Sequence, residues 1–321
     1  GASDASVLAV LNHWIASAFG ASEGLSARDR IIIFDIRLPR MVLGVLIGAS
    51  LAVCGAILQG VFRNPLADPG IIGVSAGASL GAVSMIVLGG SVLTPVTAFL
   101  GIYALPLAAF IGSIVVTVVL YKISTRRGQT SVATMLLAGI ALAALAGALM
   151  GILVFKATDL QLRELTFWGL GSVAGATWTK VAAAGPFIVA ALLFSPYLAR
   201  GLNAMTMGEA TARHMGLSVQ LFKRMSIVCV AAAVGAAVSV SGGIGFVGIV
   251  VPHLLRLLIG PDHRYLLPAS ALLGAILLLI ADSVARTIVA PAELPIGIIT
   301  AAVGAPFFLW ILLSRRKVLD M

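Results

Sequence analysis

The chain has 321 residues, 60% of them hydrophobic and 10% charged, and its mean hydropathy is +1.11. Soluble globular domains do not have this composition, which indicates a polytopic membrane protein. The apolar runs are continuous and about 20 residues long, so they predict membrane-spanning helices rather than the strands of a barrel. The net charge of +9 does not indicate nucleic-acid binding, because Lys and Arg gather in the loops of membrane proteins.

The first 30 residues are expected to lie outside the membrane or at its interface. Residues 5–19 place their apolar side chains on one helical stripe, which favours a helix lying in the interfacial plane. The stretch RDRIIIFDIRLPR, residues 28–40, then brings four arginines directly before the first long apolar run. Four arginines are more than is needed to anchor the end of a membrane span, so they call for an explanation.

Nine apolar runs predict membrane spans. They cover residues 41–61, 71–89, 98–121, 132–155, 180–198, 225–241, 244–259, 266–286 and 296–314. The seventh run contains Pro252 and follows the sixth after SGG, so this pair is expected to form a tight hairpin with a kinked second helix. Neither a repeat nor a linker divides the chain, which predicts one all-α transmembrane domain over residues 1–321.

The distribution of Lys and Arg predicts the orientation of these spans. Thirteen of the basic residues fall in the loops of one face and eight in those of the other, so the first face is expected to be cytoplasmic. The N-terminus of the chain is then external and its C-terminus cytoplasmic. The stretch 28–40 carries half of the external positive charge, which departs from the positive-inside rule and suggests a function.

Two overlapping GxSxG strings, GVSAG at 73–77 and GASLG at 77–81, raise the alternative of an intramembrane serine hydrolase using Ser75 or Ser79. That chemistry needs a base near the hydroxyl, and the four histidines all fall in loops or at span ends. Close helix packing through small residues is the preferred interpretation of both strings.

Two cytoplasmic connections differ in composition from simple turns. FRNPLADPG, residues 62–70, has low helical propensity, because its prolines constrain their neighbours and Asn64 and Asp68 favour local turns. MGEATARHMGLSVQLFKR, residues 207–224, predicts a short helix bounded by glycines within the longest cytoplasmic connection, 199–224. Its small residues would allow close docking on another protein. An ordinary solvated loop is the alternative for each connection.

The energy for any transport is expected to come from outside this chain. No GxxxxGK[ST] motif occurs, so another chain would have to bind ATP. The spans lack the unpaired ionisable residues of proton-coupled transporters, and Asp282 and Arg286, four positions apart, can neutralise each other. Cys54 and Cys229 lie in apolar runs and form no ligand cluster, so neither a metal site nor a bound cofactor is expected.

A series of longer strings carries a family resemblance. In chain order they are IRLPR, GAILQGVFRNPLADPGIIGVSAGASLG, MLLAGIAL, GEATARHMG, GGIGFVGIVVPHLLR, GPDHR, LLPASALLGA and AELPIGIITAAVGAPFF. From about residue 31 to residue 316 the chain resembles the permease subunits of FecCD or cobalamin-type ABC importers. The resemblance implies a bundle of about ten transmembrane helices, of which the first is missing here and nine remain. It also implies a multi-pass protein of the bacterial cytoplasmic (inner) membrane, without enzymatic activity.

The same resemblance implies the partners of the chain. The family works as a homodimer in membrane lipid, with two ATP-binding cassette subunits that bind ATP and Mg inside the cell. A soluble periplasmic or extracellular substrate-binding protein docks outside. No nucleic-acid partner is implied.

The resemblance also implies roles for individual residues, and none of these roles follows from spacing. A cationic external rim for an acidic binding protein corresponds to Arg37, Arg40 and Arg286. A cytoplasmic gate corresponds to Asn64 and Leu66, together with Thr130, Ser131 and Thr134 at the start of a pathway-lining helix. The element that couples to the ATPase corresponds to Gly208, Glu209, Ala210, Arg213, His214 and Gly216.

The family carries haem, ferric siderophores and cobalamin. The stretch RELTFWGLGSVAGATW and the lack of coordinating side chains along the spans favour haem or a related iron chelate, because an apolar path does not trap a metal. Such a path would also suit cobalamin, and a ferric siderophore remains a further alternative.

Overall fold

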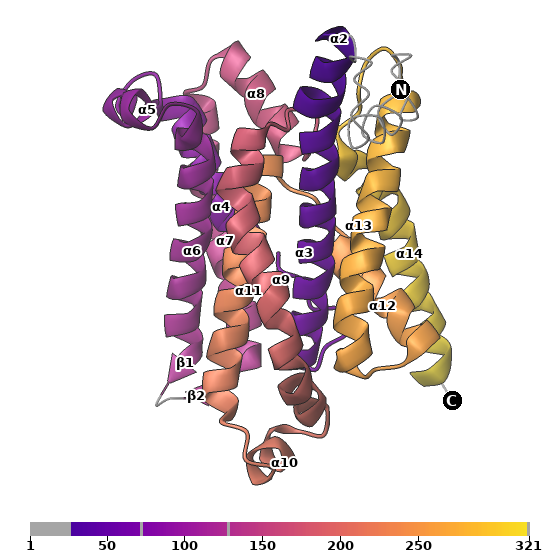
Figure 1. The fold of residues 1–321 in the computed structure, drawn as a ribbon. Coiled ribbons are helices and arrows are strands. Elements are labelled where there is room, and N and C mark those ends of the chain that lie inside the picture. Colours follow the sequence, from indigo (N-terminus) through magenta and orange to yellow (C-terminus); the bar gives the residue numbers. More distant parts are fainter. Residues whose placement is uncertain (1–26, 71–72, 127–128, 320–321) are drawn as a thin grey trace, which may run out of the picture.

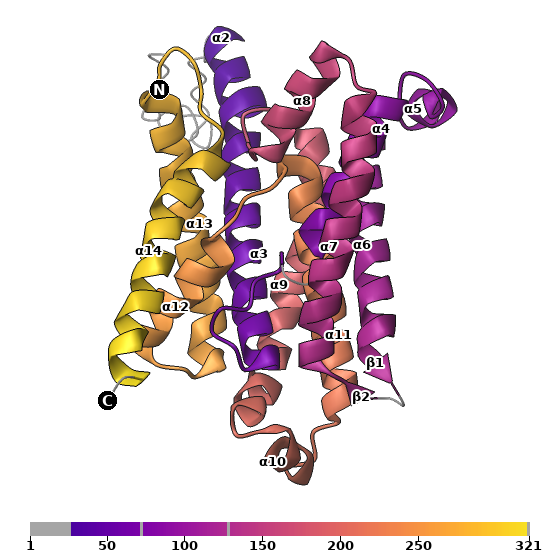
Figure 2. The ribbon, with the colours of Figure 1, turned by 180° about the vertical axis from the view of Figure 1, so that it is seen from behind.

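The computed structural model describes residues 27–70, 73–126 and 129–319, and in these ranges the chain is a bundle of helices with one short ribbon (Figures 1 and 2). The first helix is continuous from α2 (Ala27–Arg30) through the π-helical segment η1 (Ile31–Arg37) into α3 (Leu38–Phe62). The later elements are α4 (Val74–Leu88), α5 (Thr94–Leu100), η2 (Gly101–Tyr103), α6 (Ala104–Ser124), β1 (Thr125–Arg126), β2 (Gln129–Thr130), α7 (Val132–Phe155), α8 (Asp159–Gly169), α9 (Trp178–Thr206), α10 (Glu209–His214), α11 (Val219–Ser241), α12 (Val247–Ile259), α13 (His263–Thr287) and α14 (Ile296–Leu319).

Helix α3 forms the centre of the bundle. It packs against α9, α11, α12 and α13, and most of its residues from Leu43 to Phe62 are buried. A second group of helices, α4, α6 and α7, joins this centre through α11. Helix α7 lies at the edge of the bundle and exposes most of its apolar side chains (Figure 2).

Small residues allow the helices to approach closely. A Cβ atom added to Gly77 of α4 would lie 2.3 Å from the Gly112 carbonyl oxygen of α6, and one added to Gly48 of α3 would lie 2.3 Å from the Gly274 carbonyl oxygen of α13. Real Cβ atoms do not come so near to a carbonyl oxygen, so these contacts require glycine. They confirm helix packing as the function of the GVSAG string, since dispersion contacts between close backbones stabilise helix pairs in membranes.

Each of the nine expected spans coincides with a helix, but the helices differ in length. Within the described residues, six apolar helical segments are long enough to cross a membrane, and Val74–Leu88, Val247–Ile259 and Ile296–Trp310 are shorter apolar helices. Helix α12 has 13 residues and therefore rises only about 20 Å, less than the thickness of the hydrocarbon core. The expected hairpin partner of the sixth span is thus a short helix, with the non-helical residues 242–246 before it.

The first helix begins earlier than the sequence predicts. We expected the first span to start at residue 41 after an external segment, but residues 27–40 are already helical and continuous with α3. The charged residues between positions 28 and 40 are compatible with a helix, because most of their side chains lie on its accessible surface. The expected interfacial helix at 5–19 lies outside the described residues.

The two ends of the bundle carry different elements. Helices α2, α5 and α8 lie at one end, whereas α10, the β1–β2 ribbon and the C-terminal end of α14 lie at the other (Figures 1 and 2). Helix α9 continues to Thr206 and α11 begins at Val219, so only residues 207–218 separate them, which is less than the expected connection of 199–224.

Candidate functional site

Helix α10, the expected coupling element, protrudes from the bundle (Figure 1). Gly208, at φ +107°, starts it, and Gly216, at φ +86°, follows its end; both values favour glycine. Ala212 is fully buried and anchors the helix, while Met207 and Met215 are 66% and 63% exposed. Ala210, Arg213 and His214 are also exposed, so this element presents an accessible surface.

A buried lysine joins α10 to the start of α7. Lys223 of α11 is 1% exposed, and its Nζ donates to Glu209 Oε1 at 2.6 Å and to the Thr130 carbonyl oxygen at 3.2 Å. The Thr130 N–H donates to Gln220 Oε1 at 3.0 Å. The structure therefore connects Glu209 of the expected coupling element with Thr130 of the expected gate.

The other two expected gate residues of this segment meet at the N-terminus of α7. Ser131 is the N-cap, and its Oγ accepts a hydrogen bond from the Thr134 N–H at 3.3 Å. The Thr134 hydroxyl lies 3.1 Å from the same oxygen. Such a cap satisfies a backbone N–H that the helix leaves unpaired, and it fixes where α7 begins.

The FRNPLADPG loop is a compact turn after α3. Arg63 ends α3 in the left-handed region at φ 51°, and Asn64 Oδ1 accepts a hydrogen bond from the Leu66 N–H at 3.0 Å. Leu66 is half-buried. The Gly70 N–H donates to Asp68 Oδ1 at 2.8 Å, while burial raises the pKa of the Asp68 carboxyl above its ordinary value.

This loop is held by α12 rather than by the Thr130 segment. Gln59, one turn before the end of α3, donates from Nε2 to the Gly248 carbonyl oxygen at 3.0 Å, and its Oε1 accepts a short hydrogen bond from Arg256 Nη1. The Asn64 N–H donates to the Gln59 carbonyl oxygen at 3.1 Å. Within the described residues, the two expected gate segments thus have separate supports, and the hydrogen bonds above join only the Thr130 segment to α10.

The connection between α12 and α13 carries a further polar cluster at the same end of the bundle. Asp262 caps α13 by accepting from the Arg264 N–H at 2.9 Å, and Asn203 of α9 donates to it at 2.6 Å. Hydrogen bonds from the Arg264 side chain, then from its backbone N–H and Asn203, hold the pKa of the Asp262 carboxyl well below its usual value. This cluster fixes the start of α13 against α9.

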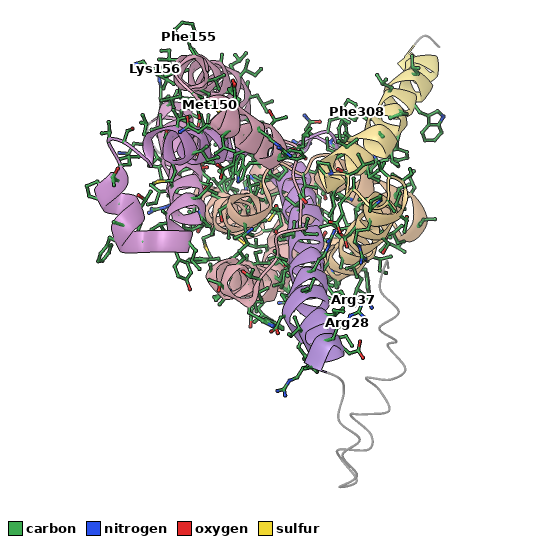
Figure 3. All side chains as sticks on the ribbon, turned by 90° about the horizontal axis from the view of Figure 1, so that it is seen from above. Arg28, Arg37, Met150, Phe155, Lys156 and Phe308 are labelled. Atoms are coloured by element: carbon green, nitrogen blue, oxygen red, sulfur yellow. The ribbon has the colours of Figure 1, made fainter. Side chains whose placement is uncertain are left out.

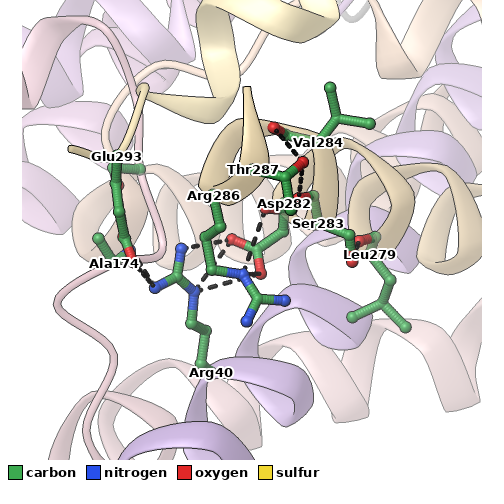
Figure 4. A network of polar contacts seen from close by, with 10 residues as sticks. Arg40, Ala174, Leu279, Asp282, Ser283, Val284, Arg286, Thr287 and Glu293 are labelled. Atoms are coloured by element: carbon green, nitrogen blue, oxygen red, sulfur yellow. Dashed lines mark hydrogen bonds and ion pairs between the residues drawn. The ribbon is translucent and has the colours of Figure 1, made fainter. Parts of the chain in front are cut away.

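Arg40 belongs to the interior of the protein, which corrects its expected place in an exposed cationic rim. The residue is 8% exposed, and Figure 4 shows its guanidinium between two carboxylates. Its Nη2 donates to Asp282 of α13 at 2.7 Å and its Nη1 to Glu293 at 2.9 Å. Two acids within the chain therefore balance the charge of this buried guanidinium, which leaves little of it for an external partner.

Arg286 takes part in the same network. Its Nε lies 3.2 Å from Asp282 Oδ2, as expected for an acid and a base four positions apart, and its side chain is 29% exposed. Arg37 is half-buried at the end of η1, and Arg28 is exposed on α2. Seen along the bundle in Figure 3, Arg28 and Arg37 lie on the first helix at the periphery, away from Phe155 at the end of α7.

A cavity lies next to α8, at the end of the bundle opposite α10. Its volume is about 510 Å³, and Arg163, Phe167, Trp168 and Lys180 are among the residues that line it. The Arg163 guanidinium lies 5.8 Å from the Phe167 ring centre. The cavity thus combines aromatic surface with two cations, Arg163 and Lys180, and with the carboxylate of Glu164.

Sequence reasoning missed the residues that organise these sites. The sequence assigns no individual role to Lys223, Gln220 or Gln59. Their signal in the sequence is weak, because each partner lies on another element. Among the residues that the structure describes, no group of three or more His, Cys, Asp or Glu side chains is placed to hold a metal ion.

These features define the protein as a multi-pass helical membrane protein of the transporter class, with a protruding helix at one end. The FecCD transport family matches residues 2–314, and the chain belongs to this family. It is 46% identical over 283 residues to the hemin transport system permease protein HmuU of Yersinia pestis, covering 88% of this chain and 83% of that protein. It is 44% identical over 302 residues to the cobalamin import system permease protein BtuC of Halobacterium salinarum, covering 94% and 79%.

A solved structure supports the same assignment. The chain resembles an inward-facing metal-chelate type ABC transporter with a TM-score of 0.81 and 31% identity, covering 95% of this chain and 97% of the other. The protein is therefore the permease subunit of an ABC importer and not itself an enzyme, which removes the serine hydrolase alternative. ATPase and substrate-binding subunits complete an importer of this class.

Proposed function

We propose that this permease moves haem or a related iron chelate into the bacterial cytoplasm by ATP-driven alternating access. The observation that carries the substrate is the 46% identity to the hemin permease over 88% of the chain. The composition of α7 is compatible with this cargo, because Val132–Phe155 contains no His, Cys or charged residue that would hold a metal. The cavity beside α8 offers aromatic rings and two cations, next to the single carboxylate of Glu164, to a flat anionic macrocycle.

Cobalamin is the second candidate, supported by the 44% identity to the cobalamin permease over 94% of the chain. The two cargoes are separated by reconstituting the permease with its ATPase and binding protein in proteoliposomes. Hemin is expected to accumulate in the presence of ATP, while cyanocobalamin at the same concentration does not. Accumulation of cyanocobalamin alone would assign the second candidate, and the absorption spectrum of ligand copurified with the binding protein gives an independent result.

In this proposal the protein works as a homodimer, with the transport pathway on the two-fold axis. The exposed apolar side chains of α7, among them Leu137 at 70% and Ile140 at 66%, support an interface or pathway there. The gate residues Asn64, Leu66, Thr130, Ser131 and Thr134 then lie toward the cytoplasm. The protein itself holds no cofactor, and ATP with Mg is bound by the two ATPase subunits.

The membrane orientation follows from the charge distribution. With thirteen basic residues on its side, the end that carries α10 faces the cytoplasm of the inner membrane, and the start of the first helix faces outward. Helix α10 would then dock on an ATPase subunit through its exposed surface. The external binding protein would meet the opposite end, where Arg37 and Arg28 supply positive charge and complementary acids on the partner would speed encounter.

A further inference from the structure

We infer that Lys223 is a positioning residue that transmits movement of α10 to the Thr130 end of α7. The inference rests on the proposed docking of α10 on an ATPase subunit, and it concerns contacts within this chain. Lys223 contacts both elements with one ammonium group, through Glu209 Oε1 at 2.6 Å and the Thr130 carbonyl oxygen at 3.2 Å. It thus links the coupling element to a gate segment.

The burial of Lys223 makes both contacts difficult to break separately. A lysine ammonium that is 1% exposed must keep its acceptors, because leaving it unpaired in an apolar environment costs several kcal/mol. Glu209 is less constrained, since its side chain is 35% exposed and its other oxygen lies 3.9 Å from Arg213. The lysine therefore fixes the position of Glu209 relative to Thr130.

Thr130 makes polar contacts through its N–H, its carbonyl oxygen and its hydroxyl, so a displacement of Lys223 also moves the backbone of this segment. The Thr130 N–H donates to Gln220, which lies on α11 like Lys223. The Thr130 hydroxyl lies 3.0 Å from the Thr125 hydroxyl across the β1–β2 ribbon. Ser131, the next residue, caps α7 and donates its N–H to the Ser124 carbonyl oxygen at 3.0 Å. The end of α6 and the start of α7 must then follow the start of α11.

The backbone also connects α10 to α11. Helix α10 is anchored by the buried Ala212, and residues 215–218 connect it to α11 at Val219. Glycines with positive φ flank the helix and allow it to reorient as one unit. The Glu209–Lys223 contact passes this reorientation to the first turns of α11 and to Thr130.

The test uses the permease reconstituted with its ATPase and binding protein, with hemin as the transported probe. Lys223→Met removes the ammonium and keeps a long apolar side chain, so assembly with the ATPase and nucleotide hydrolysis should be retained. We expect the amount of hemin accumulated per ATP to fall about fivefold or more, the lower end of measured coupling between linked sites. Lys223→Arg keeps the charge and should restore most of this ratio. Arg224→Met, the loss of one exposed charge at the next position, is the matched control and should resemble the wild type.

A second measurement applies even where transport is low. Nitroxide labels at Ala210 and Thr134, both exposed, report the distance between α10 and the start of α7. With and without ATP the distance distribution should stay narrow in the wild type and in Lys223→Arg, and it should broaden in Lys223→Met. A Lys223→Met protein with the transport ratio and distance distribution of Arg224→Met would overturn the inference. If the wild type shows no ATP-dependent hemin uptake, the proposed substrate fails instead, while the distance measurement still tests the link.

Discussion

Replacing Arg40 by alanine is expected to destabilise the bundle, because it removes one partner of a buried ion pair. The side chains of Arg40 and Asp282 are 9% and 6% exposed, and their closest contact is 2.7 Å. Glu293, the other acid on this guanidinium, is 40% exposed and can return to water. The cost of the substitution therefore falls mainly on Asp282, which is left in the interior with less positive charge.

The magnitude follows from what remains next to Asp282. Removing one member of a buried pair typically costs about 3–5 kcal/mol of the free energy of unfolding. Arg286 lies 3.2 Å from Asp282 and still neutralises it, so Arg40→Ala should cost about 3 kcal/mol, the lower end of this range. Arg40→Lys keeps the charge without the planar fork that serves two carboxylates, so it should cost about 1–2 kcal/mol.

The assay is reversible unfolding of the purified permease in mixed micelles, titrated with SDS and followed by tryptophan fluorescence. Arg30→Ala, an exposed arginine on the same continuous helix, is the control and should change the free energy by about 0.5 kcal/mol or less. A double-mutant cycle with Asp282→Asn should give a coupling energy of about 1–3 kcal/mol. An Arg40→Ala protein as stable as Arg30→Ala would refute the internal role of Arg40.

Three further predictions concern the proposed assembly. Gly216→Leu should uncouple ATP hydrolysis from hemin uptake while the permease stays folded. A side chain at the positive φ of Gly216 costs about 1–2 kcal/mol of strain, but the space around this residue within the chain is open. Unchanged uptake per ATP would contradict this prediction. Leu66→Cys, without the two native cysteines, should cross-link across the dimer in the cytoplasm-closed state, and failure in every nucleotide state would remove this loop from the pathway. Arg37→Glu should weaken the affinity for the binding protein about three- to tenfold at low salt and less at high salt, and the affinity is measured at both. Only the charge of Arg37 is reversed, because Arg286 is needed beside Asp282.

The spans could be predicted from the sequence because a membrane imposes length and hydrophobicity on each one separately. The long apolar helices satisfy both requirements, and each prediction needed only local residues. Helix α12 shows the limit of this reasoning. Val247–Ile259 is apolar but short, and non-helical residues precede it, so its position depends on packing against α3 and α13 rather than on its own length.

The polar contacts could be predicted only where a helical period brought the partners together. Asp282 and Arg286 are four positions apart, and their contact was expected. Arg40 is separated from Asp282 by 242 positions, so the sequence offered no way to distinguish a buried arginine from an exposed one. Lys223 meets Glu209, 14 positions earlier, only because the chain turns back after α10, and this return is a property of the fold.

The distribution of charge within the bundle bears on how alternating access would operate. Contacts such as Gly77 with Gly112 carry no ion pair, and helices packed through small residues can shift against each other without unpairing a buried charge. Ion pairs occur near both ends instead, with Arg40 and Asp282 joining α3 to α13 at one end and Lys223 joining α10, α11 and the start of α7 at the other. Because separating either pair inside the protein is costly, each group of joined helices should move as a rigid unit. Changes in the pathway would then come from sliding between helices that are packed through small residues, such as α4 and α6 at Gly77 and Gly112.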